Sequence, residues 1–158
     1  MGLVIRVYRQ EDAPAVRRCV VELQEFERTI DPRLRPGEEM ADGYWENVRA
    51  RCTEANGRVV VAEQDGAVVG FLAVLTAEPF TELDDPPGTY ALVTDVVIQS
   101  SHRGRGIGRQ LLQHAEAFAR AAGATELRIG VLAENTVARQ LYRSVGFVPH
   151  LEVFVKRW

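Results

Sequence analysis

The sequence has few cysteines and no long apolar run, and each shortage excludes a class of protein. Only Cys19 and Cys52 occur in 158 residues, without a Cys-x-x-Cys spacing, so neither a disulfide framework nor a zinc or redox centre is indicated. Both lie in expected helices, and we interpret them as buried, reduced thiols. No apolar run reaches the roughly 18 residues of a membrane span, and the N-terminus lacks the layout of a signal peptide. These features predict a cytoplasmic protein that does not bind membranes.

The sequence also has few histidines, and its basic residues are fewer than its acidic ones. The chain carries 19 Lys and Arg against 22 Asp and Glu, a formal net charge of −3, which disfavours nucleic-acid binding because that function needs a basic surface. His102, His114 and His150 stand alone, outside any metalloprotease or nucleophile pattern, so we expect no metal and no nucleophilic catalysis. With a hydrophobic content of 46%, the length suits one core, and we predict a single domain over residues 1–158.

The sequence does contain a glycine-rich turn between an apolar run and a helical pattern. The turn Arg103-Gly104-Arg105-Gly106-Ile107-Gly108 follows the expected strand from Tyr90 to Ile98, and Gly123 ends the helix after it. Free amides at a helix N-terminus bind phosphate, and glycines let the backbone approach it closely. The turn therefore predicts a site for a cofactor that bears a diphosphate. The apolar stripe of the helix consists of Ile107, Leu111, Leu112, Ala115, Phe118, Ala119 and Ala122.

Two nucleotide-binding patterns fail at this turn. A P-loop needs Lys and Ser or Thr after the glycines, and a dinucleotide fingerprint needs a third glycine where Arg109 stands. The remaining spacing, Arg103-x-x-Gly106-x-Gly108, resembles the pyrophosphate signature of the GNAT superfamily of acetyl-coenzyme A-dependent N-acetyltransferases. Downstream, Asn135-x-x-Ala138-x-x-x-Tyr142-x-x-x-Gly146-Phe147 is similar to the second half of the same family pattern. The two motifs lie between Leu92 and Phe147, and the N-terminal half carries no comparable signal.

The resemblance implies a direct transfer of acetyl from acetyl-coenzyme A to a primary amine, without a covalent enzyme intermediate. It also implies a cofactor site, although several of its residues have structural alternatives. Arg103 and Arg105 are either solvated charges or counter-charges for phosphate. Asn135 caps a helix, holds the pantetheine arm, or does both. The implied cofactor-binding residues are Val96, Val97, Ile98, Arg103, Gly104, Arg105, Gly106, Ile107, Gly108, Arg109, Asn135, Ala138 and Tyr142.

Two residues are catalytic candidates under this resemblance. The amine must lose a proton before it attacks, because its pKa lies near that of lysine, about 10.4. Asp95 is the candidate base, since a carboxylate is unusual within an apolar strand; the alternative is a buried carboxylate bonded to backbone or arginine. A main-chain amide around Val97 or Ile98 would polarise the thioester carbonyl. Tyr142 would protonate the leaving thiolate, although its helical spacing also suits a core residue.

The acceptor amine is not specified by any motif. Glu78, Glu82, Asp84 and Asp85 form either an acidic rim that attracts a cationic amine or a solvated loop. Tyr44 and Trp45 form either an aromatic wall for the acceptor or part of the core. We favour a small-molecule amine over a peptide amine. The alternative function is a non-catalytic module of the same fold that binds acetyl-coenzyme A as a sensor or an interaction surface.

The fold implied by the resemblance is a single-domain α/β GNAT fold with a mixed, mostly antiparallel sheet whose central strands splay apart, flanked by helices. After Gly146-Phe147 only eleven residues remain, which leaves the far wall of the acceptor pocket short. A second subunit would then cover an open sheet edge, giving a homodimer. The expected elements are strand Leu3 to Tyr8, a helix from Asp12 to Ile30, helix Glu38 to Ala55, hairpin strands Val59 to Glu63 and Ala67 to Leu75, the strand and helix described above, strand Leu127 to Leu132, a helix after Asn135, a short strand at Val148-Pro149, and a longer last strand, Leu151 to Lys156.

Overall fold

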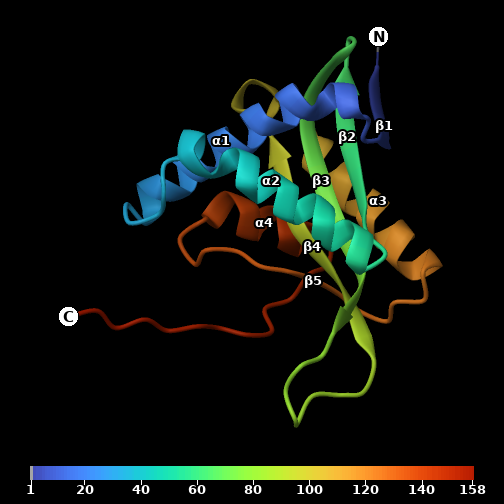
Figure 1. Cartoon of the computed structure of the whole chain (residues 1–158), viewed down its shortest axis with the longest axis vertical. Helices are drawn as coiled ribbons and strands as arrows, with labels where there is room; N and C mark the ends of the chain where they lie inside the picture. Colours follow the sequence, from blue (N-terminus) through green and yellow to red (C-terminus); the bar gives the residue numbers. More distant parts are fainter. Residues whose placement is uncertain (1) are drawn as a thin grey trace.

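Five strands form one sheet in the order β1-β2-β3-β4-β5, with helices on both of its faces (Figure 1). The structure is a computed structural model that describes residues 2–158. Its elements are β1 (Leu3–Val7), the 3-10 helix η1 (Gln10–Asp12), α1 (Ala13–Ile30), α2 (Gly37–Glu54), β2 (Arg58–Gln64), β3 (Ala67–Pro79), β4 (Thr89–Ile98), the 3-10 helix η2 (Ser100–His102), α3 (Ile107–Ala121), β5 (Leu127–Ile129) and α4 (Thr136–Ser144).

The sheet is mixed and mostly antiparallel, as the sequence predicted. The pairs β1-β2, β2-β3 and β3-β4 are antiparallel, and only β4-β5 is parallel. The apolar run of β3 is buried from Val69 to Thr76, because this central strand has helices against both faces. The mixed sheet with flanking helices confirms the predicted fold class.

Each face of the sheet has its own hydrophobic core. Helices α1 and α2 cover one face, where Cys19 and Trp45 pack with Phe71 of β3. Helices α3 and α4 cover the other face, where Leu111 packs with Leu72 of β3. The stripe of α3 predicted from the sequence supplies this second core, since apolar side chains at helical spacing share one face.

A bulge in β4 decides which way the middle of that strand faces. Ala73 pairs with Asp95 and Val74 pairs with Val93, so Thr94 is an extra residue in β4. In a regular strand Val93 and Val97, four residues apart, would share a face. Here Val93 joins the core under α3, whereas Val97 joins the core under α1 and α2. The bulge therefore turns Asp95 toward α1 and α2.

The edge between β4 and β5 is open over half of β4. The two strands pair only at Ala91–Leu127, Leu92–Arg128 and Val93–Ile129, and β5 ends at Ile129. Beyond this point no strand within residues 2–158 pairs with the outer edge of β4, which is the splay that the family resemblance implied.

Neither of the two predicted C-terminal strands, Val148-Pro149 and Leu151 to Lys156, forms. Leu151 to Lys156 has no strand partner and runs as an extended arm away from the body (Figure 1). Apolar residues do alternate in this segment, but a strand also needs a neighbouring strand that hydrogen-bonds to its amides and carbonyls. Likewise β5 is shorter than the predicted Leu127 to Leu132, because β4 and β5 diverge after Ile129.

Candidate active site

The glycine-rich turn lies directly after β4 and leads into α3. Gly104 and Gly106 have φ angles of 75° and 79°, a left-handed conformation that favours glycine, and open space surrounds the position where each Cβ would be. Gly106 is the N-cap of α3, so the amides that follow it have no intrahelical partner. The first turn of α3 therefore presents free N–H groups and the positive end of the helix dipole, which suits phosphate.

Gly108 serves a different purpose from the other two glycines. It is buried, and a Cβ at this position would lie 2.8 Å from Leu141 Cδ2 and 3.2 Å from Ile98 Cδ1. The missing side chain thus lets α3 pack closely against α4 and β4. Our expectation that the glycines make room for phosphate fits Gly104 and Gly106, but at Gly108 the close neighbour is protein.

Three arginines surround this turn, and two of them tie it to the body. Arg103 donates from Nε to the carbonyl of Ile98 at 3.0 Å, and its Nη2 lies 3.4 Å from Glu22 Oε1. Arg109 donates to the carbonyl and hydroxyl of Ser144, at 3.3 and 3.2 Å, which joins α3 to the end of α4. Arg105 makes one bond, to the carbonyl of Ser101 at 3.2 Å, and is otherwise exposed. The turn is therefore cationic, with Arg105 the freest to move.

The open edge of β4 presents main-chain groups of alternate residues. The Gln99 amide donates to Val69 of β3 at 2.9 Å, and in an antiparallel ladder residues two apart face the same neighbour, so the Val97 amide also faces β3. The Ile98 carbonyl faces the other way, where Arg103 binds it. Of the two amides expected to polarise a thioester carbonyl, the Ile98 amide lies on the open edge and the Val97 amide does not.

Asn135 and Ala138 bond to each other at the start of α4. Asn135 Oδ1 accepts from the Ala138 amide at 3.1 Å, which confirms the helix-cap interpretation. The Ala138 amide is therefore occupied, and a contact between Asn135 and a pantetheine arm stays a prediction.

Tyr142 of α4 is half-buried, with an unbonded hydroxyl. Its ring packs edge-on against Phe147, with ring centroids 6.0 Å apart, and belongs to the core under α3, so the core interpretation is confirmed. Among residues 2–158 nothing hydrogen-bonds to its hydroxyl. Burial raises the Tyr142 pKa to about 12, and the negative charges of Glu27 and Asp95 act in the same direction. The hydroxyl is thus protonated at neutral pH and close enough to both acids to sense their charge.

Asp95 is one of three polar or charged residues that are buried in the described chain. It is 5% exposed, its Oδ1 accepts from the Tyr44 hydroxyl at 2.7 Å, and its Oδ2 is buried without a partner. Burial raises the Asp95 pKa, against the opposing effects of the hydrogen bond from Tyr44, the nearby Thr94 side chain and the positive charge of Arg51. A buried carboxylate oxygen with no donor is costly, which points to a functional role.

Glu27 of α1 is a site residue that the sequence analysis missed. Burial raises its pKa, and the like charge of Asp95 raises it further. Its spacing in the sequence could have indicated that it is partly buried. It lies four residues after Leu23 and seven after Val20, which places it on the apolar stripe of α1. Only the fold shows that this stripe position is near β4. Glu27, Tyr44 and Asp95 together form an acidic cluster beside β4, which we call the carboxylate pocket.

The other acceptor candidates lie elsewhere. Trp45 is buried against Tyr8 and Phe71, with ring centroids 5.2 and 5.7 Å apart, so it belongs to the core. Asp85 accepts from the amides of Thr81 and Glu82 within its own loop. That loop precedes Thr89, six residues and therefore roughly 20 Å along the strand from Asp95. The solvated-loop interpretation fits Glu82, Asp84 and Asp85, but not Glu78, which lies in β3 and pairs with Arg51 at 3.2 Å. Tyr44 is the aromatic residue that contacts Asp95.

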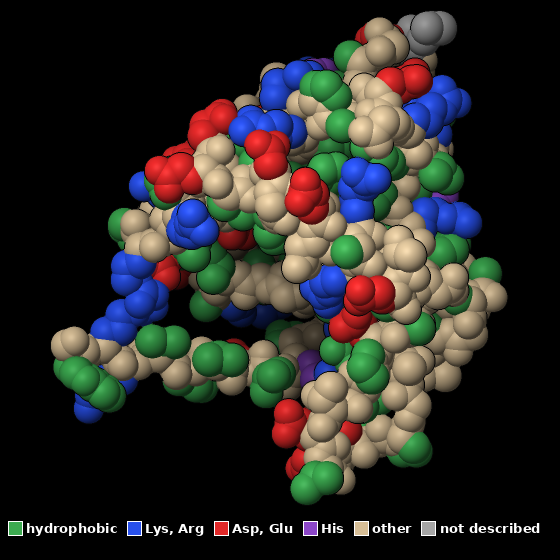
Figure 2. Space-filling model, in the orientation of Figure 1, with side chains coloured by type: hydrophobic (Ala, Val, Ile, Leu, Met, Phe, Trp, Pro, Cys, Tyr) green, Lys and Arg blue, Asp and Glu red, His purple; other side chains and the backbone are tan. Residues whose placement is uncertain are grey.

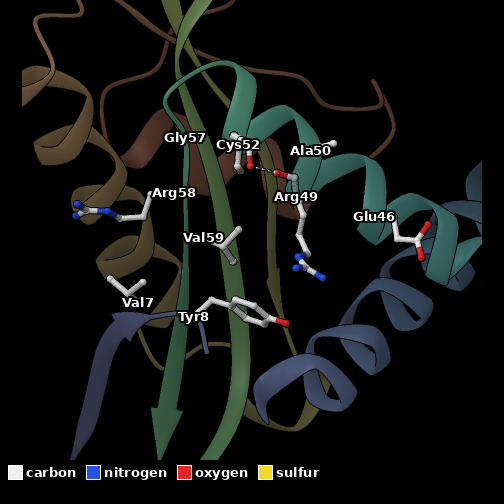
Figure 3. Close-up of a pocket in the computed structure, with 10 residues that line it drawn as sticks. Val7, Tyr8, Glu46, Arg49, Ala50, Cys52, Gly57, Arg58 and Val59 are labelled. Atoms are coloured by element: carbon white, nitrogen blue, oxygen red, sulfur yellow. Dashed lines mark hydrogen bonds between the residues drawn. The ribbon is translucent and has the colours of Figure 1, made fainter. Parts of the chain in front are cut away.

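A groove of about 600 Å³ lies at the opposite edge of the sheet, between α2 and the ends of β1 and β2. In Figure 3, Tyr8 and Arg49 point into it from opposite sides. None of the expected cofactor or catalytic residues lines this groove. Cys52, one of its lining residues, is only half-buried, whereas Cys19 is fully buried; burial raises both thiol pKa values to about 11, so both thiols stay protonated.

Comparisons with known proteins identify the family. The model of the acetyltransferase (GNAT) family matches residues 20–147. Thialysine N-epsilon-acetyltransferase of Mus musculus is 30% identical over 146 residues, covering 90% of this chain and 82% of the relative. Streptothricin acetyltransferase of Streptomyces lavendulae is 37% identical over 95 residues, covering 60% of this chain and 46% of the relative. The chain belongs to the GNAT acetyltransferase family.

Solved structures agree on the fold. A mutant of the BH1408 protein of Bacillus halodurans superposes with a TM-score of 0.86 at 16% identity, covering 98% of this chain and 99% of that one. The aminoglycoside N-acetyltransferase AAC(6')-Iy superposes with a TM-score of 0.69 at 19% identity, covering 100% and 99%. With the family established, the protein is an acetyl-coenzyme A-dependent N-acetyltransferase. Within residues 2–158, no helix is long and apolar enough to cross a bilayer, and no three potential metal-ligating side chains gather.

Proposed function

We propose that this enzyme acetylates a small, cationic primary amine, with Asp95 as the general base and Tyr142 as the general acid. The observation that carries the proposal is the buried, unpartnered Oδ2 of Asp95 next to the open edge of β4. This oxygen can accept a proton from an amine, because Tyr44 already occupies the other carboxylate oxygen.

The residues of the turn fit a diphosphate. Gly104 and Gly106 leave open space where a side chain would fill it, and the first amides of α3 are free. Arg105 is the arginine best placed to move onto a phosphate, since its single bond is to an exposed carbonyl. Acetyl-coenzyme A supplies the acetyl thioester. The Ile98 amide would donate to the thioester carbonyl oxygen, and Asn135 would lie beside the pantetheine.

The proton route is set by the pKa values of three side chains. The raised pKa of Asp95 makes it a stronger base than an exposed carboxylate once it is ionised. The pKa of Glu27 is raised too, so Glu27 and Asp95 are two neighbouring carboxyl groups that share the negative charge. On the other side of the opening, the Tyr142 hydroxyl stays protonated and can donate to the departing sulfur.

The charge of the carboxylate pocket supports a cationic acceptor. The pocket contains two acids and one tyrosine, and an ammonium group would offset the cost of burying those acids. The printed names of curated relatives point to small molecules, namely thialysine and streptothricin. A peptide amine is the less supported acceptor, because neither of these names refers to a peptide.

We also propose that the enzyme acts in the cytoplasm. The two cysteines are unpaired, and one of them is fully buried as a thiol. Unpaired thiols are typical of reducing compartments.

The test is an acceptor panel assayed by release of the coenzyme A thiol. The panel contains a diamine, a lysine analogue, an aminoglycoside, a neutral-tailed monoamine of similar length, and a short peptide with a free N-terminus. We expect the highest kcat/KM among the small polycationic amines. Turnover confined to the peptide would contradict the proposed acceptor. Saturable binding of acetyl-coenzyme A without turnover of any amine would favour the non-catalytic sensor instead.

A further inference from the structure

Glu22 of α1 joins the glycine-rich turn to the first helix of the molecule. Its Oε1 accepts a hydrogen bond from the Ser100 amide at 2.7 Å and lies 3.4 Å from Nη2 of Arg103. In Figure 1 the connection between β4 and α3 accordingly lies beside α1. Within residues 2–158, the other hydrogen bonds of η2 and the turn stay inside the segment that runs from β4 to α3. Glu22 is therefore the hydrogen-bonding contact that holds the turn against α1.

The Glu22 carboxylate occupies groups of the kind that bind phosphate. A main-chain amide and an arginine are common phosphate ligands in proteins. The Arg103 guanidinium also lies over the ring of Phe26, 5.9 Å from the ring centroid, and Phe26 follows Glu22 by one turn of α1. Arg103 is nevertheless 43% exposed, so an anion that enters the turn can reach it. Helix α1 therefore holds an arginine that a diphosphate can also use.

Glu22 has two opposite effects on a diphosphate at the turn. Its bonds to Ser100 and Arg103 keep the turn in one shape, which favours binding because less order has to be gained. Its negative charge neutralises Arg103 and repels phosphate, which opposes binding. The pair of Glu22 and Arg103 is partly exposed, and exposed ion pairs are weak, so a more highly charged diphosphate can draw Arg103 away from Glu22.

We propose that Glu22 is a positioning residue of the cofactor site, and that it limits the affinity for acetyl-coenzyme A by competing with the diphosphate for Arg103. The inference rests on the proposed role of the turn as the diphosphate site. The same competition speeds the release of coenzyme A, because the product carries the same diphosphate. Arg105, whose one bond is to the Ser101 carbonyl, is free of this competition. Glu22 lies outside both sequence motifs, and only the fold brings it to Ser100, 78 positions away.

Glu25 offers a matched control on the same helix. Its Oε1 accepts from the Gly37 amide at 2.7 Å, and its Oε2 pairs with Arg28 at 2.9 Å, so it makes the same two kinds of bond away from the turn. Acidic and basic side chains are interspersed over the face that α1 and α2 form (Figure 2). Because the surface is mixed in charge, a difference between substitutions at Glu22 and Glu25 reports the contacts of each residue rather than a change in overall charge.

Calorimetric titration of the full chain with acetyl-coenzyme A, in about 20 mM and about 0.5 M NaCl, tests the competition. Glu22→Gln keeps an oxygen for the Ser100 amide but removes the charge, so its Kd at low salt should be about threefold below that of the wild type. At high salt, which screens charges, the difference should nearly vanish. Glu25→Gln should keep the wild-type Kd in both buffers. A purely structural role for Glu22 predicts the opposite sign, because loss of a structural contact weakens binding.

Three results of this titration would overturn the proposal. They are a Glu22→Gln variant that binds no more tightly than the wild type, a gain that is equally large at both salt concentrations, and an equal gain for Glu25→Gln. Gly106→Glu is titrated in the same series to test the site itself. If Gly106→Glu retains the wild-type Kd, the turn is not the diphosphate site and the proposed function fails there. If Gly106→Glu loses binding and Glu22→Gln gains none, only the inference about Glu22 fails.

Two further variants separate the competition for Arg103 from the positioning of the turn. In an Arg103→Met background there is nothing to compete for, so Glu22→Gln should leave the Kd for acetyl-coenzyme A nearly unchanged. The full gain in that background would show direct repulsion of the cofactor and overturn the competition. Glu22→Ala also removes the acceptor of the Ser100 amide, so it should bind about threefold more weakly than Glu22→Gln. Equal Kd values for these two variants would contradict the positioning role.

Discussion

The two sides of the opening between β4 and β5 present different chemical groups. The glycine turn is exposed from Arg103 to Gly106 and offers arginines and the free main-chain amides at the start of α3. The carboxylate pocket combines the buried Asp95 with the half-buried Glu27 and the exposed Tyr44, and it offers side-chain oxygens drawn from α1, α2 and β4. Binding of the cofactor should therefore depend on backbone shape and space, whereas proton transfer should depend on single side chains. Substitutions can separate the two.

The largest effect is expected at Asp95. Asp95→Asn keeps an acceptor for the Tyr44 hydroxyl but removes the base, so kcat should fall by about a thousandfold. The Kd for acetyl-coenzyme A, measured by calorimetry, should stay within about twofold, because the carboxylate lies on the other side of the opening. Asp84→Asn in the exposed loop is the control and should have wild-type turnover. A variant with near-normal kcat would show that a water chain or Glu27 is the base.

The complementary change is in the turn. Gly106→Glu places a carboxylate against the phosphates, and the Kd for acetyl-coenzyme A should rise by at least about a hundredfold. Gly66→Glu is a matched control, because Gly66 has nearly the same φ angle, 78° against 79°, and the same open surroundings in the β2–β3 hairpin. Both variants carry the same backbone strain, so only the first should lose calorimetric binding. Equal losses would mean that strain, not the phosphate site, is responsible.

A smaller effect is expected at Tyr142. Tyr142→Phe keeps the ring packed on Phe147 but removes the donor, and kcat near pH 7 should fall about tenfold. The loss should shrink above the thiol pKa of about 8.5, where the thiolate leaves without a proton. A pH–rate profile of both enzymes measures this, with Tyr90→Phe as the control. A loss that is constant over the whole pH range would indicate a packing role alone.

Glu27 should affect which amine the enzyme prefers as acceptor. Glu27→Gln removes one charge from the carboxylate pocket, so KM should rise about three- to fivefold for a diamine and hardly change for a neutral-tailed monoamine. The ratio of kcat/KM values for the two amines is the measurement. Glu46→Gln, on the exposed part of α2, should leave that ratio unchanged. Equal changes for both amines would remove Glu27 from acceptor recognition.

The smallest effect concerns stability. Burial raises the native pKa of Asp95 above the value of about 3.9 expected for the unfolded chain. Between these values the native state binds more protons, so this group lowers the free energy of unfolding as pH rises from about 4 to the native pKa. Asp95→Asn should therefore be more stable than the wild type by about 1 kcal/mol at neutral pH and equal to it below about pH 4. Urea unfolding between pH 3 and 8 measures the difference.

Asp12→Asn supplies a control of opposite sign. The hydrogen bond from Arg6 holds the Asp12 pKa below its usual value. Its contribution is present above about pH 3.9 and is lost as pH falls through the native pKa, so this variant should be less stable than the wild type at neutral pH. The same sign for both variants would contradict the burial argument for Asp95.

Several elements were predictable because their signals are local. The stripe of α3, the Asp65-Gly66 hairpin and the Asn135 cap depend on residues within a few positions of one another. The last strand, Leu151 to Lys156, was predicted wrongly by the same kind of reasoning. Its alternation is genuine, but whether such a segment becomes a strand depends on a partner edge that no local pattern reveals.

By itself, the sequence determined the phosphate turn, because a backbone site needs only glycines, a helix start and their spacing. It also marked Asp95 as a misfit in an apolar strand. Only the tertiary structure decided which face Asp95 occupies, through the extra residue Thr94 in β4, and which side chains meet it there. Glu27 and Tyr44 lie 68 and 51 positions from Asp95, and contacts over such separations follow from how helices pack on a sheet.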